Sequence, residues 1–192
     1  MTSCYTPVVI HDETLDRTTS MTGRVAERPW FEVGRAVLRR ADGSMTDQTV
    51  PNLLRALPDR ASPQRSMLVE IKPDPRDAIV EAVAGYAGPG IELQSFELRI
   101  VLRAIQLTRG KVHLLVEDPE VLRQSIEGPW AGVNVRHDLL DGAAVERLHA
   151  AGKRVGVWTV NDERDLRRAL AIGVDTIITD EPLLARKLME SL

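Results

Sequence analysis

The sequence has little cysteine, few aromatic residues, no long hydrophobic run and no strong excess of charge. Its one cysteine, Cys4, excludes an internal disulfide and is typical of a reducing compartment. A net charge of -3 gives no general attraction to nucleic acid or anionic lipid, so we expect neither as a partner. No apolar run reaches the roughly 20 residues that cross a bilayer, and we expect no transmembrane segment. Residues 1–12 lack the pattern of a signal peptide. We therefore expect a cytoplasmic protein, on the condition that no signal peptide precedes Met1.

Aliphatic residues, by contrast, are plentiful. The chain has 192 residues, of which 43% are hydrophobic and only 4% aromatic. This length and composition suit one domain with a sizeable core, and we take residues 1–192 as that domain. The preference for Val, Leu, Ile and Ala over aromatic residues favours an α/β fold, in which branched side chains fill buried parallel strands.

From Met67 onward, short apolar runs alternate with segments of helical periodicity, such as residues 98–105. Gly152 and Gly173 fall where helices should end, just before the next strand. The runs that predict strands are 67–72, 91–96, 112–117, 131–135, 154–160 and 176–180. Strands and helices that alternate in this way predict a parallel sheet.

Two parallel folds compete, an open doubly wound sheet and a (β/α)8 barrel. An open sheet that binds a nucleotide carries a glycine-rich first turn, which this sequence lacks. Polar residues gather instead at the carboxyl ends of several strands, where a barrel builds its active site, and we favour the barrel. A barrel has eight strands and about 250 residues, so six units plus the run "TPVVIHD" are one or two short. Residues 13–66 are polar and have no clear strand, only a helix candidate over 50–59. We expect them to form an excursion over the barrel mouth.

The run "MLVEIK" places Glu70 and Lys72 on one face of a strand, because side chains two residues apart share a face. A buried carboxylate and a buried ammonium cost several kcal/mol unless they are paired or bind a charged ligand. The two residues therefore form a structural ion pair, or else Glu70 binds a divalent cation and Lys72 an anionic substrate. Oxygen ligands suit Mg2+ or Ca2+. The sequence has no Cys/His cluster that would indicate zinc.

Single residues near other strand ends are further candidates. His11 ends the run "VVIH" and is either a proton donor and acceptor or a structural histidine. Asp12 should project to the opposite face and cap the next turn rather than orient His11. Trp158 either lines a pocket for a small polar molecule or packs in the core. His113 lies at the start of its strand, the wrong end for a barrel site, and Asp180 should cap the last helix.

Five segments in sequence order resemble the glycerophosphodiester phosphodiesterase family, from about residue 2 to the C-terminus. They are "PVVIHDETLDRTT", "VEIKPD", "LQSFELRIVLRA", "GKRVGVWTVND" and "GVDTIITDEP". The resemblance implies a (β/α)8 barrel of the PLC-like phosphodiesterase type. It implies an enzyme of lipid and glycerol metabolism that uses a divalent cation, Mg2+ or Ca2+, to hydrolyse glycerophosphodiesters to an alcohol and glycerol 3-phosphate. His11 would be one of two catalytic histidines and Glu70 a metal ligand. Lys72 would face the phosphate, and Trp158 would line the substrate pocket.

Two motifs of that family are absent, a His-Arg on its first strand and a Glu-x-Asp on its second. We therefore expect the printed chain to lack the first βα unit and most of the second strand. We also expect it to hold Mg2+ or Ca2+ weakly and to show little or no phosphodiesterase activity. Open sheet edges would favour association with another chain. One alternative is a non-catalytic remnant that binds phosphodiesters or a partner subunit. Another is a different phosphate-handling barrel, such as an aldolase or isomerase.

Overall fold

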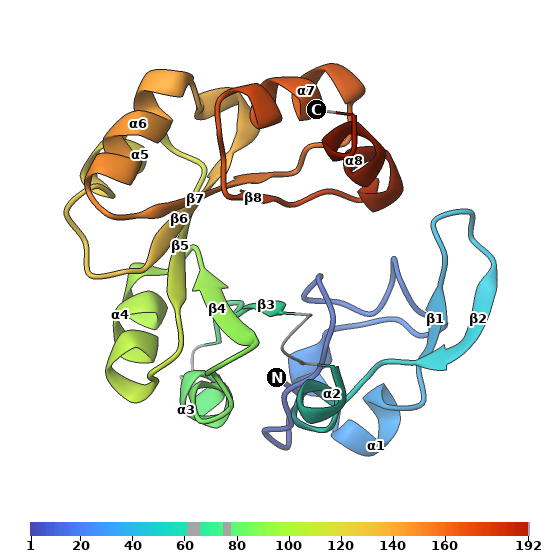
Figure 1. Cartoon of the computed structure of the whole chain (residues 1–192). Coiled ribbons are helices and arrows are strands. Elements are labelled where there is room, and N and C mark those ends of the chain that lie inside the picture. The colour runs from blue at the N-terminus through green and yellow to red at the C-terminus, as the bar shows by residue number, and fades with distance from the viewer. Residues whose placement is uncertain (61–65, 75–77, 192) are drawn as a thin grey trace.

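The computed structural model describes residues 1–60, 66–74 and 78–191. A curved parallel sheet with its helices forms one part of the molecule, and residues 1–52 form a smaller lobe beside it (Figure 1). The elements up to the start of the sheet are η1 (Val25–Glu27), α1 (Trp30–Val33), β1 (Val37–Arg39), β2 (Met45–Thr49) and α2 (Leu53–Arg60). The sheet part contains β3 (Met67–Glu70), α3 (Ala78–Ala84), β4 (Ile91–Ser95), α4 (Leu98–Leu107), β5 (Val112–Val116), α5 (Pro119–Gln124), β6 (Gly132–Arg136), η2 (His137–Leu139), α6 (Gly142–Ala150), β7 (Arg154–Trp158), α7 (Glu163–Ala171), β8 (Thr176–Ile177) and α8 (Pro182–Met189).

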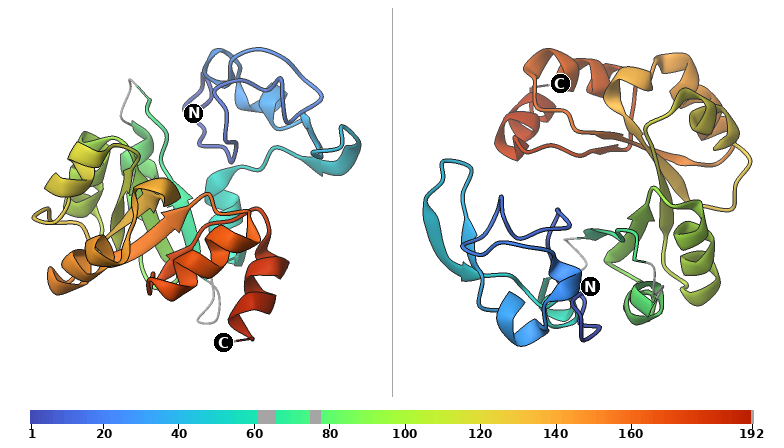
Figure 2. Two further views of the ribbon diagram at one scale, coloured as in Figure 1. Left: turned by 90° about the horizontal axis from the view of Figure 1, so that it is seen from above. Right: turned by 180° about the vertical axis from the view of Figure 1, so that it is seen from behind.

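The sheet has six parallel strands in the order β3-β4-β5-β6-β7-β8, so each strand pairs with its neighbours in sequence. A helix follows each strand, and the helices lie along the outer side of the curve (Figures 1 and 2). Consecutive parallel strands with outer helices are the arrangement of a (β/α)8 barrel, which confirms the predicted fold class. In the described part of the chain, β3 and β8 are the two edges of a partial barrel.

Alternation along the strands separates an outer apolar face from an inner polar face. The outer residues pack with the helices in one large core and include Val69, Leu93, Leu114, Val133 and Val155. The alternate positions, which face inward, include Glu70, Gln94, His113, Asn134 and Gly156. Each polar inward side chain therefore needs a partner within the curve of the sheet or in a ligand.

The N-terminal lobe has a small core of its own. Its buried residues are Leu15, Val25, Val33, Ala36 and Val50. β1 and β2 pair as an antiparallel hairpin, so the expectation that residues 13–66 contain no strand is wrong. The hairpin escaped prediction because β2 reads "MTDQT" and is largely exposed, which leaves no apolar alternation to detect. That the lobe covers a barrel mouth, and that residues 1–192 are one domain, stay predictions.

Residues 7–11 do not form the short strand that the sequence predicts. Val8 makes only an isolated antiparallel bridge with Asn52. The helix predicted over residues 50–59 is confirmed as α2, whose Leu53 and Leu57 belong to the core of the sheet. The segment before His11 is therefore attached to the start of α2 and has no place in the sheet.

All six strands predicted from Met67 onward form. The predicted helix ends are also confirmed, since Gly152 and Gly173 adopt φ of +73° and +78° two residues after the last residues of α6 and α7. Among the described residues, Asp118, Asp141 and Asp162 each precede a helix and accept backbone N–H groups of its first turn through their side chains. Within the described ranges, no helix has both the length and the apolar character needed to cross a membrane.

Candidate active site

The carboxyl ends of the strands carry the polar and aromatic residues that the sequence singled out. Glu70 is the last residue of β3, Gln94 and Ser95 end β4, and Trp158 ends β7. Ser95 stabilises the sheet, because its buried hydroxyl donates to the carbonyl oxygen of Ile71 at 2.7 Å. The remaining three side chains belong to inward positions at the end where barrel enzymes place their active sites.

Glu70 and Lys72 form the ion pair that their spacing predicts. Lys72 Nζ lies 2.6 Å from Glu70 Oε1, and both side chains are partly buried. Val69 and Ile71 point the other way, into the core under the helices. Glu70 Oε1 is buried and accepts no hydrogen bond from the described residues, since the ammonium of Lys72 approaches it without hydrogen-bond geometry. This oxygen therefore keeps the capacity to bind one more positively charged group or donor.

Trp158 is fixed by residues from two other strands. Its indole Nε1 donates to the backbone oxygen of Asn134 at 2.9 Å. The Asn134 side chain donates in turn to Gln94 Oε1 at 2.6 Å, and both amides are buried. The ring of Phe96 meets the indole edge-on, with 5.4 Å between centroids and an angle of 87°. Sequence reasoning did not single out Phe96, although its position two residues after Gln94 was a usable signal.

His11 lies in the lobe, beside Asp12 and Arg17. His11 Nδ1 is 2.8 Å from Asp12 Oδ1. Arg17 donates to both oxygens of the same carboxylate, at 2.7 Å and 2.8 Å. Hydrogen bonds from Arg17 and His11 hold the pKa of Asp12 far below its ordinary value. The expectation that Asp12 would face away from His11 is therefore wrong. It assumed a strand, and without one neighbouring side chains are free to meet.

The structure brings together two of the four predicted site residues. Glu70 and Lys72 are in contact, whereas the contacts found across the described residues do not join His11 or Trp158 to them or to each other. The side chain of His11 is 72% exposed, so no neighbour encloses it. The catalytic, metal-binding and substrate-binding roles of these residues stay predictions.

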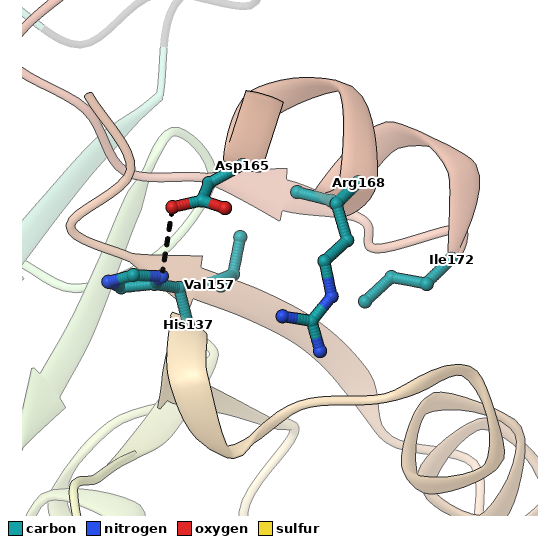
Figure 3. Close-up of a pocket in the computed structure, with 6 residues that line it drawn as sticks. His137, Val157, Asp165, Arg168 and Ile172 are labelled. Carbon is teal, nitrogen blue, oxygen red and sulfur yellow. Dashed lines mark ion pairs between the residues drawn. The ribbon is translucent and has the colours of Figure 1, made fainter. Parts of the chain in front are cut away.

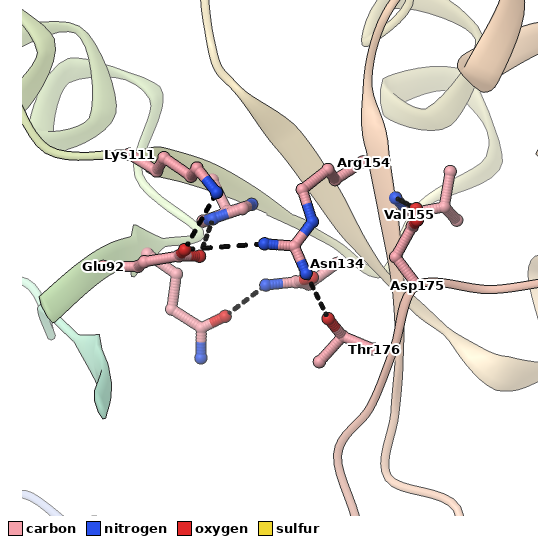
Figure 4. Close-up of polar contacts among 9 residues, drawn as sticks. Glu92, Lys111, Asn134, Arg154, Val155, Asp175 and Thr176 are labelled. Atoms are coloured by element: carbon pink, nitrogen blue, oxygen red, sulfur yellow. Dashed lines mark hydrogen bonds and ion pairs between the residues drawn. The ribbon is translucent and has the colours of Figure 1, made fainter. Parts of the chain in front are cut away.

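A second polar cluster lies at the opposite end of the strands (Figure 4). Glu92 is contacted by His113 Nε2 at 2.7 Å, by Lys111 Nζ at 3.4 Å and by Arg154 Nη1 at 3.5 Å. Burial lowers the pKa of His113 despite the adjacent carboxylate. Burial alone would raise the pKa of Glu92, but His113 and the two cations outweigh it and lower this pKa. Each charge in this cluster has a partner, which is typical of a stabilising network at the amino end of a barrel.

A small pocket lies outside the sheet, between η2 and α7 (Figure 3). Its polar lining consists of His137, Asp165 and Arg168. His137 Nδ1 is 3.9 Å from Asp165 Oδ2, and Arg168 donates to the backbone oxygen of Leu140 at 2.7 Å. The pocket also contacts Val157, whose side chain belongs to the outer face of the sheet. It is a packing crevice between helix and sheet rather than part of the strand-end site.

Asp180 does not cap the last helix, contrary to expectation. Its carboxylate accepts from Asn161 Nδ2 at 2.9 Å, and its backbone N–H donates to Asn161 Oδ1 at 2.9 Å. α8 begins at Pro182, and the residue before it, Glu181, makes no capping hydrogen bond. The carboxylate of Asp180, which would have capped the helix, is instead hydrogen-bonded to Asn161, a residue that follows β7.

The residues present do not make a complete metal site. Ca2+ takes six to eight oxygen ligands, and Mg2+ takes six, of which one or two are usually protein carboxylates. Over residues 1–60, 66–74 and 78–191, no three His, Cys, Asp or Glu side chains gather in a way that could hold a metal ion. Glu70 Oε1 is suitable as a single ligand, but Lys72 already neutralises its charge.

Comparisons with known proteins agree on one family. Residues 1–184 match the sequence model of the glycerophosphoryl diester phosphodiesterase family. A glycerophosphodiester phosphodiesterase of Bacillus altitudinis is 24% identical over 206 residues, which cover 96% of this chain and 81% of the relative. A phosphodiesterase structure from Oleispira antarctica, in complex with the product sn-glycerol-3-phosphate, is similar with a TM-score of 0.84 and 21% identity, over 99% of this chain and 82% of that one. A glycerophosphodiester phosphodiesterase structure from Thermotoga maritima gives 0.75 and 21%, over 98% and 81% of the two chains.

Proposed function

The chain belongs to the glycerophosphoryl diester phosphodiesterase family, and from this premise we propose that it hydrolyses glycerophosphodiesters to an alcohol and glycerol 3-phosphate. The observation that carries the proposal is the extent of the match. It spans residues 1–184 and so includes the lobe with His11 as well as the strand end with Glu70 and Lys72. The relative from Oleispira antarctica, which holds sn-glycerol-3-phosphate, supports a substrate of this chemical class.

The proposed chemistry assigns each residue a task suited to its side chain. Lys72 faces the phosphate and offsets the negative charge that grows on it in the transition state. Glu70 keeps the ammonium of Lys72 in place through the 2.6 Å contact. His11 exchanges a proton with the attacking water or the departing alcohol. The indole of Trp158, held by its hydrogen bond and by Phe96, lines the pocket for the glycerol part.

The family resemblance also implies a divalent cation, Mg2+ or Ca2+, to which Glu70 would supply one oxygen ligand. One carboxylate that is already paired with Lys72 holds such an ion weakly. We therefore expect the printed chain to turn over substrate far below the roughly 1–1000 per second that is usual for enzymes. The alternative of a non-catalytic remnant that binds phosphodiesters remains a distinct outcome of the same experiment.

The experiment measures glycerol 3-phosphate released from glycerophosphocholine by the purified chain, with Mg2+ or Ca2+ added. General acid–base catalysis contributes typically 100- to 10,000-fold, so His11→Gln should lower the rate by about 100-fold or more. His149→Gln is the matched control, because His149 lies on α6 and, within the described residues, pairs with Asp175 just before the amino end of β8. Equal rates for the parent chain and His11→Gln would overturn the proposed role of His11.

Binding of the product separates the two functional alternatives. The chain is titrated with sn-glycerol 3-phosphate, and NMR signals of Lys72 and Trp158 are followed. Saturable shifts that Lys72→Met abolishes, without any hydrolysis, would favour the remnant that only binds. Hydrolysis at an ordinary enzymatic rate would contradict the expected impairment and leave the hydrolase assignment intact.

Location and partners follow the same proposal. We propose a small-molecule substrate, no nucleic-acid partner and, on the condition that no signal peptide precedes Met1, a cytoplasmic location. The edges β3 and β8 of the partial barrel make association with another chain a further part of the proposal. Size-exclusion chromatography with light scattering checks this last point, because association through a sheet edge would raise the measured mass above 21.3 kDa.

A further inference from the structure

We propose that Asp12 and Arg17 fix His11 in the tautomer that carries its proton on Nδ1, so that Nε2 is the atom available for proton transfer. The inference rests on the proposed function of His11 and adds two positioning residues to it. Neither residue needs to touch substrate, because both act through the imidazole.

The direction of the first hydrogen bond follows from the chemistry of its two ends. Asp12 Oδ1 lies 2.8 Å from His11 Nδ1. An ionised carboxylate only accepts hydrogen bonds, so Nδ1 must be the donor. In a neutral imidazole the other nitrogen is then bare, and it becomes the base. A carboxylate that orients a catalytic histidine in this manner acts on both the tautomer and the angle of the ring.

Arg17 makes this arrangement stable. Its guanidinium donates through Nε to Oδ2 at 2.7 Å and through Nη2 to Oδ1 at 2.8 Å, so both carboxylate oxygens are held at once. These two hydrogen bonds favour the ionised form of Asp12 and oppose its rotation away from His11. The side chains of His11 and Arg17 are 72% and 64% exposed, whereas that of Asp12 between them is only 24% exposed. An exposed imidazole has little packing to restrain it, which is why a clamped carboxylate has an orienting role here.

A neighbouring pair provides an internal comparison. Glu13 and Arg24 also form an acid–guanidinium contact in the lobe, at 2.8 Å, but it involves no histidine. Removal of that carboxylate changes the local charge by the same amount as removal of the Asp12 carboxylate. Glu13→Gln is therefore the matched control for Asp12→Asn.

The test is the tautomer of His11, observed by long-range 1H–15N NMR correlation in the full chain at alkaline pH, where imidazoles are neutral. The chain has four histidines, and the His11 signals are assigned by their loss in His11→Gln. We expect the parent chain and Glu13→Gln to show a protonated Nδ1 and a bare Nε2. Asp12→Asn should shift the population toward protonated Nε2, because an amide can donate as well as accept.

Arg17 is tested with a pair of variants. Arg17→Gln should produce part of the shift seen in Asp12→Asn. Arg17→Lys keeps the charge without the planar fork and should fall between Arg17→Gln and the parent. Unchanged signals of Leu15 and the other lobe core residues show that each variant is folded. A parent chain with protonated Nε2, or an Asp12→Asn variant with the parental tautomer, would overturn the proposal, and an unchanged tautomer in Arg17→Gln would remove Arg17 from it.

This readout does not depend on turnover. A tautomer fixed as expected, together with hydrolysis that is insensitive to His11→Gln, would refute the proposed catalytic role of His11 and leave the orienting contact intact. The opposite pattern, hydrolysis that requires His11 but a free tautomer, would refute only the inference about Asp12 and Arg17.

Discussion

Replacement of Gly156 by alanine should be among the most destabilising single-methyl additions in the sheet. Gly156 pairs with Asn134 across β6 and β7, and a Cβ atom at position 156 would overlap Asn134 Oδ1. To make room, the buried amide of Asn134 must turn and give up its 2.6 Å hydrogen bond to Gln94. An unsatisfied buried polar group costs about 1–3 kcal/mol, and overpacking costs about 1–3 kcal/mol. Gly156→Ala should therefore lower the free energy of unfolding by about 2–6 kcal/mol.

Urea denaturation followed by circular dichroism measures this difference, with an unchanged slope as the sign of two-state unfolding. Gly142→Ala is the matched control, because a Cβ at position 142 meets no atom within 4 Å, and it should change stability by less than about 1 kcal/mol. The decisive comparison repeats Gly156→Ala in an Asn134→Ala background, where no amide is left to overlap. There the loss should fall below about 1 kcal/mol. The same loss in both backgrounds would refute the argument from Asn134.

Three further predictions concern pH, the lobe and metal binding. Burial lowers the pKa of His113, so the unfolded state binds more protons and stability should fall as the pH drops below about 6.5. Urea denaturation should show a flatter pH profile for His113→Gln than for His149→Gln. Leu15→Ala removes a fully buried side chain and should cost about 2–5 kcal/mol, with faster hydrogen exchange confined to residues 1–52. Calorimetry should detect Mg2+ or Ca2+ binding only at about millimolar concentration or above, and Glu70→Gln should abolish it.

The sheet could be predicted from the sequence because its strands are buried on the outer face and bounded by glycines. Runs such as residues 112–116 have apolar side chains that only a covered parallel strand would place together. The same reasoning failed in the lobe, for two different reasons. β2 is too exposed to show a pattern. The apolar run with Val8 and Ile10 is typical of a strand, yet these residues pack against the small core of the lobe. An apolar run predicts that its residues are buried, but it does not indicate which core they join.

The contacts of the site were predictable between residues close in sequence, and unpredictable where they depend on the curvature of the sheet. The Glu70–Lys72 contact follows from a spacing of two residues at the carboxyl end of β3, where Glu70 is the last strand residue and Lys72 lies just beyond it. Gln94 and Asn134 stand on β4 and β6, which are not neighbours, since β5 lies between them. Strands two apart in a flat sheet are separated by about 9.5 Å, too far for this hydrogen bond unless the sheet curls and tilts the side chains inward. The sequence of β4 or of β6 alone does not indicate how strongly the sheet curls between them.

The inner face of the sheet retains two buried polar atoms without a hydrogen-bond partner among the described residues, Glu70 Oε1 and His113 Nδ1. The two atoms differ in their surroundings and therefore in their capacity to bind a ligand. His113 Nδ1 lies against Gly132, where a Cβ atom would overlap it, and the glycine therefore leaves space that the ring itself fills. Glu70 Oε1 lies at the carboxyl end of β3, the end at which barrel enzymes bind their ligands, and among the described residues it contacts the ammonium of Lys72. Lys72 offsets the charge of this oxygen, but a buried carboxylate oxygen that accepts no hydrogen bond still costs folding free energy, so a ligand that donates a hydrogen bond to Glu70 should increase the stability of the chain.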